Sequence, residues 1–294
     1  MDKRIDAAAK VIESGDGQPF LRFMADTYHG HRNGSDPKIL ALAAEIGLIR
    51  NAGDKIELTN PGFLVGNVAK EYCHYVDYGR TTAPPKPSRE MIEGKDVLDL
   101  GCSFGRSLWE FQRVARSAVG LEPQEEYIVL GRALSVQENV AAPKIINGPA
   151  EELARHFGPA SLDVIFTRLV LNYVKVKPVL GQMVAALRPG GTLYILVDSP
   201  SNLPRRLLAG GSSLQRRGWI LLALLNLPVC VLTGRQLSVT IPGRMHTRHN
   251  PAYLPLWWWR KALLRRGLRD FRTFPGSGAL VFCATKPAST ENAR

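Results

Sequence analysis

Residues 95–123, KDVLDLGCSFGRSLWEFQRVARSAVGLEP, run in the order of a strand, a glycine loop, a helix, a second strand and an acidic residue. The apolar run 97–100 has the length and composition of a buried parallel strand, and residues 108–114 have helical character. The second run, 118–121, ends in Glu122. A carboxylate at the tip of this strand can accept both hydroxyls of a ribose. The stretch therefore predicts a nucleoside pocket and favours an enzyme.

Small residues occupy alternate positions of the loop, at Gly101, Ser103 and Gly105. They let backbone N–H groups approach a ligand closely at a helix N-terminus. Ordinary turns use glycine as well, so the loop alone does not decide the function.

Strand and helix patterns continue to alternate along the chain. Strands are expected at 144–146, 163–167, 192–197 and 279–285, and helices at 151–157, 177–187 and 256–268. This alternation predicts a mainly parallel sheet that binds ligands at the carboxyl edge of its strands.

Five motifs in this order resemble the class I S-adenosylmethionine (SAM) dependent methyltransferases, whose first motif runs acid-x-Gly-x-Gly-x-Gly. The motifs are Asp99 with the loop 101–105, Glu122, AEEL at 150–153, LDVI at 162–165 with LNY at 171–173, and LRPGG at 187–191. The resemblance covers about residues 90–200 and the last strand. It implies an α/β fold, a Rossmann-like mainly parallel sheet with helices on both faces, and SAM as cofactor.

The resemblance also implies a set of cofactor-binding residues. The loop would hold the methionine end of SAM, the acid after the second strand its ribose, and the alanine of AEEL its adenine edge. The set is Asp99, Gly101, Cys102, Ser103, Gly105, Glu122, Pro123, Ala150, Glu151 and Thr167. Two positions depart from the family pattern: Ser103 replaces a glycine, and Pro149 stands where many relatives have an acid, so adenine recognition is the least defined part.

Relatives line the acceptor pocket after the fourth strand, which points to Asn172 and Tyr173 as substrate residues. Methyl transfer from a sulfonium is an in-line displacement in which positioning supplies much of the acceleration, so a base is optional. Tyr173, His246 and His249 are the candidates for one, each with a plain packing or surface role as the alternative. The HTRH spacing does not predict a metal site, and none is expected.

The four cysteines are widely separated and predict neither a zinc site nor a disulfide framework. A reducing cytoplasm is the expected location, with peripheral membrane contact left open. The N-terminus lacks the uninterrupted apolar core of a secretory signal.

The net charge of +12 belongs to one segment. Residues 203–272 contain 13 basic residues and one acid, Asp270, so the rest of the chain is neutral on balance. A solvated basic face is one interpretation, and a contact with anionic lipid, phosphate or nucleic acid is the other.

The N-terminal region resembles winged-helix domains. Residues 37–47 predict a short helix, and GLIRNAGDKIELTNPGF at 47–63 looks like a passage from helix to wing. Some small-molecule O-methyltransferases carry such a domain for dimerisation, so a homodimer through this region is expected. The predicted division is a winged-helix-like region at 1–80, a linker at 81–89, and a methyltransferase domain at 90–288.

An insertion at 198–253 exceeds the usual connection and predicts a cap or a membrane contact. Its uncharged run within 218–233 is too short and too interrupted to span a bilayer. The three tryptophans 257–259 cannot share one buried helical face, because successive residues point about 100° apart. At least one is expected to face a lid, a ligand or lipid.

These observations favour a SAM-dependent methyltransferase acting on a small-molecule or lipid-like acceptor, hydrophobic or anionic. An RNA methyltransferase would use the basic segment for phosphates, although nucleic acid fits less well because no RNA-binding module is recognisable. A third interpretation is a SAM-binding regulator that catalyses nothing.

Overall fold

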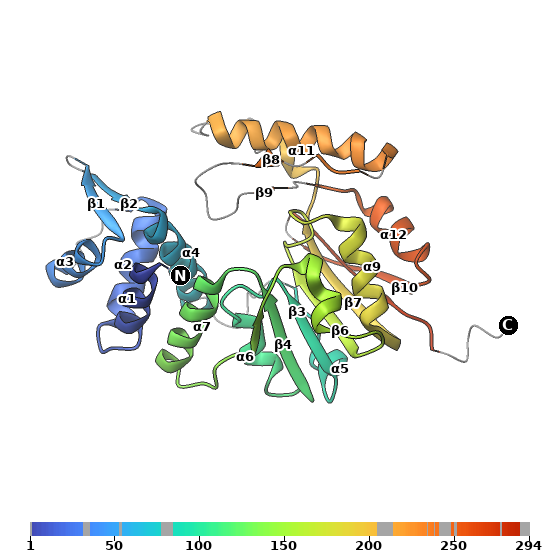
Figure 1. Cartoon of the computed structure of the whole chain (residues 1–294), viewed down its shortest axis with the longest axis horizontal. Coiled ribbons are helices and arrows are strands. Elements are labelled where there is room, and N and C mark those ends of the chain that lie inside the picture. The colour runs from blue at the N-terminus through green and yellow to red at the C-terminus, as the bar shows by residue number, and fades with distance from the viewer. Residues whose placement is uncertain are drawn as a thin grey trace. The chain divides into compact units, whose positions relative to one another are not determined.

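The structure is a computed structural model that describes residues 2–31, 36–52, 55–77, 85–204, 214–233, 235–237, 239–240, 248–249, 252–276 and 278–288 (Figure 1). The N-terminal elements are α1 (Lys3–Ile12), α2 (Gly17–His29), α3 (Pro37–Glu45), β1 (Ile49–Ala52), β2 (Lys55–Leu58) and α4 (Asn60–Asp77). The helix expected at 37–47 is confirmed. An antiparallel hairpin follows it, while the winged-helix assignment stays a prediction.

Local chemistry fixes where the first helices begin. The Asp2 carboxylate accepts a hydrogen bond from the Arg4 N–H at 3.0 Å, and the Asp36 carboxylate accepts one from the Lys38 N–H at 2.9 Å. Proline at position 37 suits the first helical turn, where its missing N–H costs nothing. Aspartate at the N-caps of α1 and α3 satisfies a donor that the helix itself leaves open.

The chain packs as two units. The N-terminal unit comprises residues 1–83, 102–113 and 122–147, and the sheet unit comprises residues 84–101, 114–121 and 148–294. The N-terminal unit therefore includes α6 (Arg106–Phe111) and α7 (Glu125–Gln137) of the methyltransferase motif region. The predicted linker at 81–89 lies partly outside the described residues.

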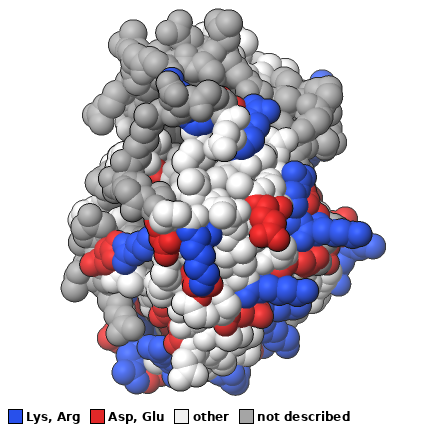
Figure 2. All heavy atoms as spheres, turned by 90° about the vertical axis from the view of Figure 1, so that its left-hand side faces the viewer, with Lys and Arg blue, Asp and Glu red and all other residues white. Residues whose placement is uncertain are grey.

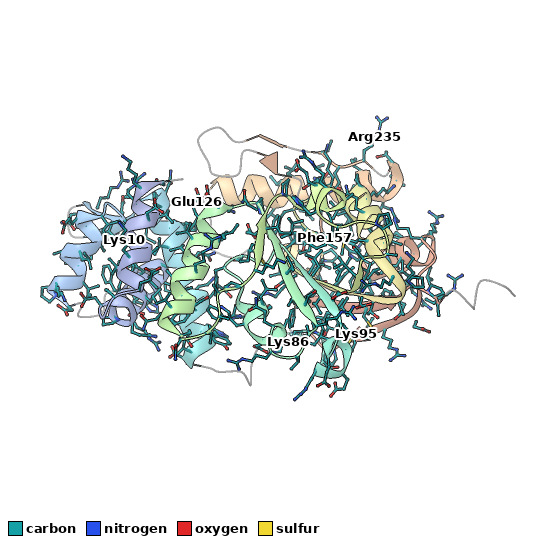
Figure 3. All side chains as sticks on the ribbon, turned by 60° about the horizontal axis from the view of Figure 1, so that its bottom comes forward. Lys10, Lys86, Lys95, Glu126, Phe157 and Arg235 are labelled. Carbon is teal, nitrogen blue, oxygen red and sulfur yellow. The ribbon has the colours of Figure 1, made fainter. Side chains whose placement is uncertain are left out.

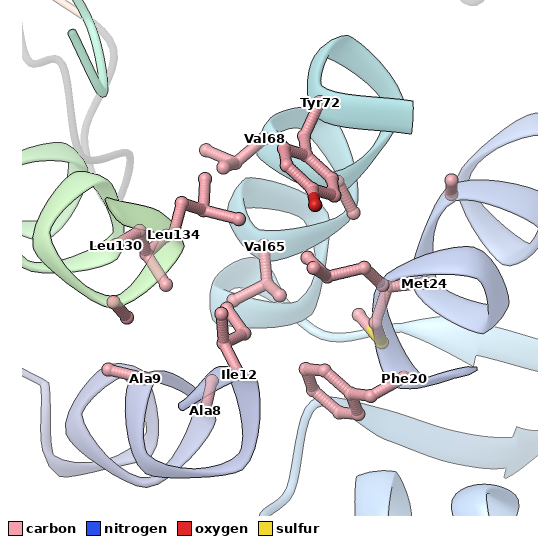
Figure 4. Packing of buried hydrophobic residues seen from close by; sticks show 14 of the residues in the cluster. Ala8, Ala9, Ile12, Phe20, Met24, Val65, Val68, Tyr72, Leu130 and Leu134 are labelled. Carbon is pink, nitrogen blue, oxygen red and sulfur yellow. The ribbon is translucent and has the colours of Figure 1, made fainter. Parts of the chain in front are cut away.

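A single apolar core holds the N-terminal unit together (Figure 4). Ile12 of α1, Val68 of α4 and Leu134 of α7 belong to it, and all three are fully or almost fully buried. Within this core Tyr72 accepts a hydrogen bond from Gln18 and donates one to Glu138. Burial of these side chains makes α6 and α7 part of the same packing unit as the first helices.

The central sheet has seven strands in the order β10-β11-β7-β6-β3-β4-β5. They are β3 (Asp96–Leu100), β4 (Ser117–Glu122), β5 (Ile145–Asn147), β6 (Leu162–Arg168), β7 (Leu187–Asp198), β10 (Arg269–Phe274) and β11 (Ala279–Thr285). β3 is parallel to β4 and β6, β6 is parallel to β7, and β10 and β11 are antiparallel additions. This topology confirms the predicted Rossmann-like α/β fold.

The remaining helices are α5 (Arg89–Ile92), the 3₁₀ turn η2 (Ala150–Glu152), α8 (Leu153–His156), α9 (Val176–Ala186), α11 (Leu214–Thr233) and α12 (Leu256–Leu264). The helix expected at 256–268 is shorter, because the chain turns at Gly267 with φ +83° and enters β10. β10 was not predicted from the sequence. Its exposed edge position requires no strict apolar alternation.

Charged side chains tie the amino ends of β3 and β6 together, away from the cofactor loop. The Asp96 carboxylate lies 2.5 Å from Arg116 and 2.8 Å from Arg188. Arg188 also lies 2.9 Å from the Asp163 carboxylate. Arg116 and Arg188 hold the pKa of Asp96 well below its usual range. The network stabilises the strand order at the end of the sheet opposite the binding edge.

The insertion contains α11 and a short pair of strands, β8 (Val239–Thr240) and β9 (Arg248–His249). Ile220 and Ala223 of α11 pack against Leu203 and Tyr253. Within the described chain, the length and apolarity of every helix fall short of what a membrane crossing requires.

Candidate cofactor and acceptor site

The loop after β3 turns on three residues with left-handed backbone. Gly101 has φ +72°, Ser103 +53° and Gly105 +85°. A Cβ at Gly101 would lie 2.1 Å from a methyl of Val170, and one at Gly105 would lie 2.7 Å from the Pro143 ring. Glycine is thus required at both ends of the loop, while the middle position carries a serine in a conformation that glycine adopts more easily.

Glu122 ends β4 with only 5% of its surface exposed. Its carboxylate accepts hydrogen bonds from the backbone N–H of Ser103 at 2.9 Å and of Gln124 at 3.1 Å. Burial raises the pKa of Glu122 to about 7, and the two N–H donors oppose that rise. Cys102 is also buried in the loop. The loop and the acid that the sequence singled out are therefore in direct contact.

Asn147 is a supporting residue of this site that was not predicted from the sequence. Its side-chain N–H₂ group donates to the carbonyls of Glu122 and Pro123, each at 3.1 Å. It thereby fixes the backbone on which the Glu122 side chain is mounted. The available signal was a polar residue at the end of the short strand β5, at the same sheet edge.

Two polar side chains are buried on the central strands. Asp99 of β3 is 3% exposed, and Thr167 of β6 is 0% exposed, one residue before that strand ends. The Thr167 hydroxyl has no hydrogen-bond partner among the described residues. A buried hydroxyl without a partner is unfavourable unless a ligand satisfies it. Its place in the strand opposite Leu100 puts it at the edge where ligands bind in this fold.

Ala150 and Glu151 begin the turn η2 directly after Pro149. Ala150 is buried. The Glu151 carbonyl accepts a hydrogen bond from the Gln182 side chain at 2.7 Å, and its carboxylate accepts one from the Lys175 N–H at 3.3 Å. These bonds hold the turn against α9, and the roles of both residues toward adenine stay predictions.

Asn172, expected to line the acceptor pocket, is fully buried and holds both ends of the insertion. Its side-chain oxygen accepts from the Asp198 N–H at 2.9 Å, and its side-chain N–H₂ donates to the Ala252 carbonyl at 3.0 Å. The Ala252 N–H donates in turn to the Asn172 carbonyl at 2.8 Å. The structure gives this amide a role in anchoring the insertion, and its contact with an acceptor stays a prediction.

Of the three candidate bases, the structure describes the side chain of one. Tyr173 is 42% exposed next to Asn172, and its catalytic role stays a prediction. His246 lies outside the described residues, and for His249 only the backbone in β9 is described. Among the side chains that the structure places, no group of three or more His, Cys, Asp or Glu could hold a metal ion.

Comparison with known proteins bears on this geometry. The family model described as "Methyltransferase domain" matches residues 98–195, from β3 into β7. This part of the chain is a methyltransferase domain. The prediction of a SAM-dependent methyltransferase with SAM as cofactor is confirmed.

Relatives of this methyltransferase domain are distant. The tRNA U34 carboxymethyltransferase of Pseudoalteromonas translucida is 31% identical over 115 residues, which make up 37% of this chain and 34% of that protein. The chain thus spans about a third of the length of this curated relative.

Solved structures show a likeness of fold. A chain in the complex between the Haloferax volcanii Trm112 methyltransferase activator and a methyltransferase matches with a TM-score of 0.52 at 15% identity, covering 77% of this chain and 95% of that one. A SAM-dependent methyltransferase from Mesorhizobium loti matches with a TM-score of 0.46 at 19% identity, covering 67% of this chain and 93% of that one.

The residues of the methyltransferase domain fit SAM. Each oxygen of the Glu122 carboxylate accepts one N–H and retains acceptor capacity for a ribose hydroxyl. The buried Thr167 hydroxyl offers a donor and an acceptor. The small residues Gly101, Ser103 and Gly105 form the loop at the start of α6, where they permit close approach of a ligand to the backbone. When bound, SAM supplies a methyl group on a positively charged sulfur.

Proposed function

We propose that the methyltransferase domain transfers the methyl group of SAM to a hydrophobic, lipid-like acceptor that binds beneath the insertion. The observation that carries this proposal is the anchoring of both ends of the insertion on Asn172. Because Asn172 follows β6, the insertion starts and ends at the carboxyl edge of the sheet, where this fold binds its ligands.

The exposed side of α11 supports an apolar acceptor. Leu221, Leu225 and Leu232 are 51%, 59% and 82% exposed, and their spacing of four and seven residues places them on one helical face. Arg235 follows the helix and projects away from the ribbon (Figure 3). A face of leucines that the protein itself leaves uncovered is suited to acyl or prenyl chains.

The protein residues would act by binding and orienting. The loop and Glu122 would hold the cofactor, and the buried Thr167 hydroxyl would hydrogen-bond to it. The insertion would exclude water from the acceptor. Tyr173, which follows the anchor Asn172 in the chain, would be the residue to receive or hold the acceptor proton. Positioning is the main contribution, because a sulfonium needs little further activation.

The test is incubation of the protein with methyl-labelled SAM and an extract of its own host, followed by separation of organic-soluble material from precipitated RNA. We expect label in the organic phase. A Gly101→Ala variant serves as the control without cofactor binding, because the new methyl group would collide with Val170. Label confined to RNA would contradict the proposal.

A second candidate is transfer to RNA. The relative at 31% identity is a tRNA enzyme, and residues 203–272 carry the whole net positive charge. RNA contacts made by this segment would weaken steeply as salt rises, because counterions released on binding must return. Binding of tRNA that falls by less than tenfold between low and physiological salt would speak against this candidate.

A further inference from the structure

The outer face of α12 combines apolar and cationic side chains. Trp257, Arg260, Lys261, Leu264 and Arg265 are all exposed and line a surface hollow of about 400 Å³. Their spacing of three, four, seven and eight residues places them on one side of the helix. Trp257 is 56% exposed, so a large aromatic ring faces solvent between three cations.

The opposite face of α12 fixes the helix on the sheet. Trp258 and Trp259 are 7% and 0% exposed, and the Trp259 ring lies 5.6 Å from that of Phe282 in β11. The Trp259 indole N–H donates to the Leu254 carbonyl at 3.1 Å. Trp258 and Trp259 thus pack α12 against the sheet, and this packing does not require Trp257.

The cations on this face differ from six exposed arginines that pair with an acid. None of the three lies within ion-pair distance of a carboxylate in the described part of the chain. Those six pairs are Arg4–Asp2, Arg22–Asp77, Arg50–Glu57, Arg89–Glu93, Arg116–Asp96 and Arg155–Glu152. Like the three cations on α12, the exposed Arg113, Arg132, Arg235, Arg269 and Arg272 have no ion pair among the described residues. Charge left without an internal partner on a single face is complementary to an external anion.

We propose that the outer face of α12 docks on an anionic lipid bilayer. Trp257 would lie at the level of the headgroups, Leu264 would enter the acyl boundary, and the three cations would meet lipid phosphates. The proposal deepens the proposed function by naming the surface that delivers a lipid-like acceptor. Vesicle binding is nevertheless measurable without methyl transfer, so the two ideas can fail separately.

The charge part is tested with the full-length protein and sedimenting vesicles of phosphatidylcholine, with or without phosphatidylglycerol. We expect binding to the anionic vesicles only. Combined Arg260→Gln, Lys261→Gln and Arg265→Gln should weaken it by about 100-fold, since each basic side chain near such a surface contributes roughly fivefold. The control combines Arg50→Gln, Arg89→Gln and Arg155→Gln, which removes the same charge elsewhere and should change binding less than about threefold.

The apolar part is tested with lipids brominated along their acyl chains, which quench tryptophan that enters the bilayer. We expect quenching in the wild type and its loss in Trp257→Phe, while Leu264→Ser should weaken vesicle binding about tenfold. Equal losses in the two charge variants, or tRNA binding that depends on these cations while vesicle binding is absent, would overturn the proposal. The proposed function would then still be supported if methyl label entered the organic phase in an assay with detergent.

Discussion

Ser103 occupies a backbone conformation that favours glycine, at the centre of the cofactor loop. Its φ of +53° lies between the left-handed Gly101 and Gly105, and its N–H donates to Glu122 at 2.9 Å. A side chain in this region costs about 1 kcal/mol, which the surrounding loop must offset. Strain of this kind is typical of sites shaped for a ligand.

Ser103→Gly should raise the free energy of unfolding by about 0.5–1 kcal/mol, because glycine removes the steric cost at positive φ. Cofactor affinity should stay within about twofold, since the backbone N–H is retained. Chemical denaturation and titration with S-adenosylhomocysteine measure the two effects. Ser107→Gly, in helix α6, is the control and should destabilise by about 0.5–1 kcal/mol. Loss of stability in both variants would contradict the prediction.

Glu122 makes cofactor binding depend on pH. Its pKa is raised to about 7, and ribose hydroxyls favour the charged carboxylate, so the protein must release a proton on binding below pH 7. S-adenosylhomocysteine should bind about tenfold more weakly at pH 6 than at pH 8. Calorimetry in buffers of different ionisation enthalpy measures the proton released. Glu122→Gln should bind weakly at both pH values, and an unchanged pH dependence in that variant would assign the proton elsewhere.

The raised pKa of Glu122 also makes the stability of the fold depend on pH. The unfolded side chain titrates near 4.3, so between that value and about 7 the folded state binds more protons. The stabilising effect of the protonated carboxyl is full below pH 4.3 and is lost as the pH rises through 7. Cofactor binding opposes this loss because it stabilises the ionised form.

At the scale of elements, side-chain amides attach the insertion to the sheet unit. Asn172 joins the end of β7 to the chain entering α12 through Asp198 and Ala252. Gln236 adds a second tie, since its amide donates to the Val174 carbonyl at 2.9 Å and accepts from the Val176 N–H at 2.8 Å. Both ties are made by residues that follow β6 or begin α9, at the binding edge of the sheet.

Asn172→Leu should detach the insertion without unfolding the sheet. The change removes two buried hydrogen bonds, and acceptor turnover should fall at least tenfold. Affinity for S-adenosylhomocysteine should change less than about twofold, which reports an intact cofactor loop. Hydrogen exchange at 198–203 and 252–254 should accelerate. Unchanged turnover together with faster exchange would show that the insertion does not cover the acceptor.

At the scale of the whole molecule, the N-terminal helices complete the methyltransferase domain. Trp109 of α6 and Leu134 of α7 lie in the same core as α1, α2 and α4, and the Trp109 indole N–H donates to Ser135 at 3.0 Å. On the face of these helices shown in Figure 2, positive and negative side chains alternate. Such a mixed surface differs from a basic patch for DNA and leaves the predicted dimer contact open to test.

Leu134→Ala should lower the free energy of unfolding by about 2–5 kcal/mol, because it leaves a cavity in the core shared by α1, α4 and α7. Val136→Ala, on the exposed side of the same helix, should change it by less than about 0.5 kcal/mol. Urea denaturation measures both. Hydrogen exchange should accelerate in α1 and α4 as well as α7, and an effect limited to α7 would contradict the shared core.

Several features followed from the sequence because they depend on neighbouring residues. The apolar runs placed β3, β4, β6 and β11 to within a residue or two. Adjacent tryptophans at 257–259 predicted that one would be exposed, and Trp257 is. Glu122 and the glycine loop followed from motif spacing, and their contact confirms that spacing.

Only the tertiary structure decided how distant residues are used. Asn172 anchors the insertion because Asp198 and Ala252, 26 and 80 residues away, come to its amide. Asn147 supports the Glu122 backbone from another strand, and α7 shares its core with α1. No local pattern encodes these pairings, because a hydrogen bond or an apolar contact between remote segments depends on the packing of the whole chain. The sequence by itself determined the cofactor chemistry, and the fold decided which surfaces remain for the acceptor.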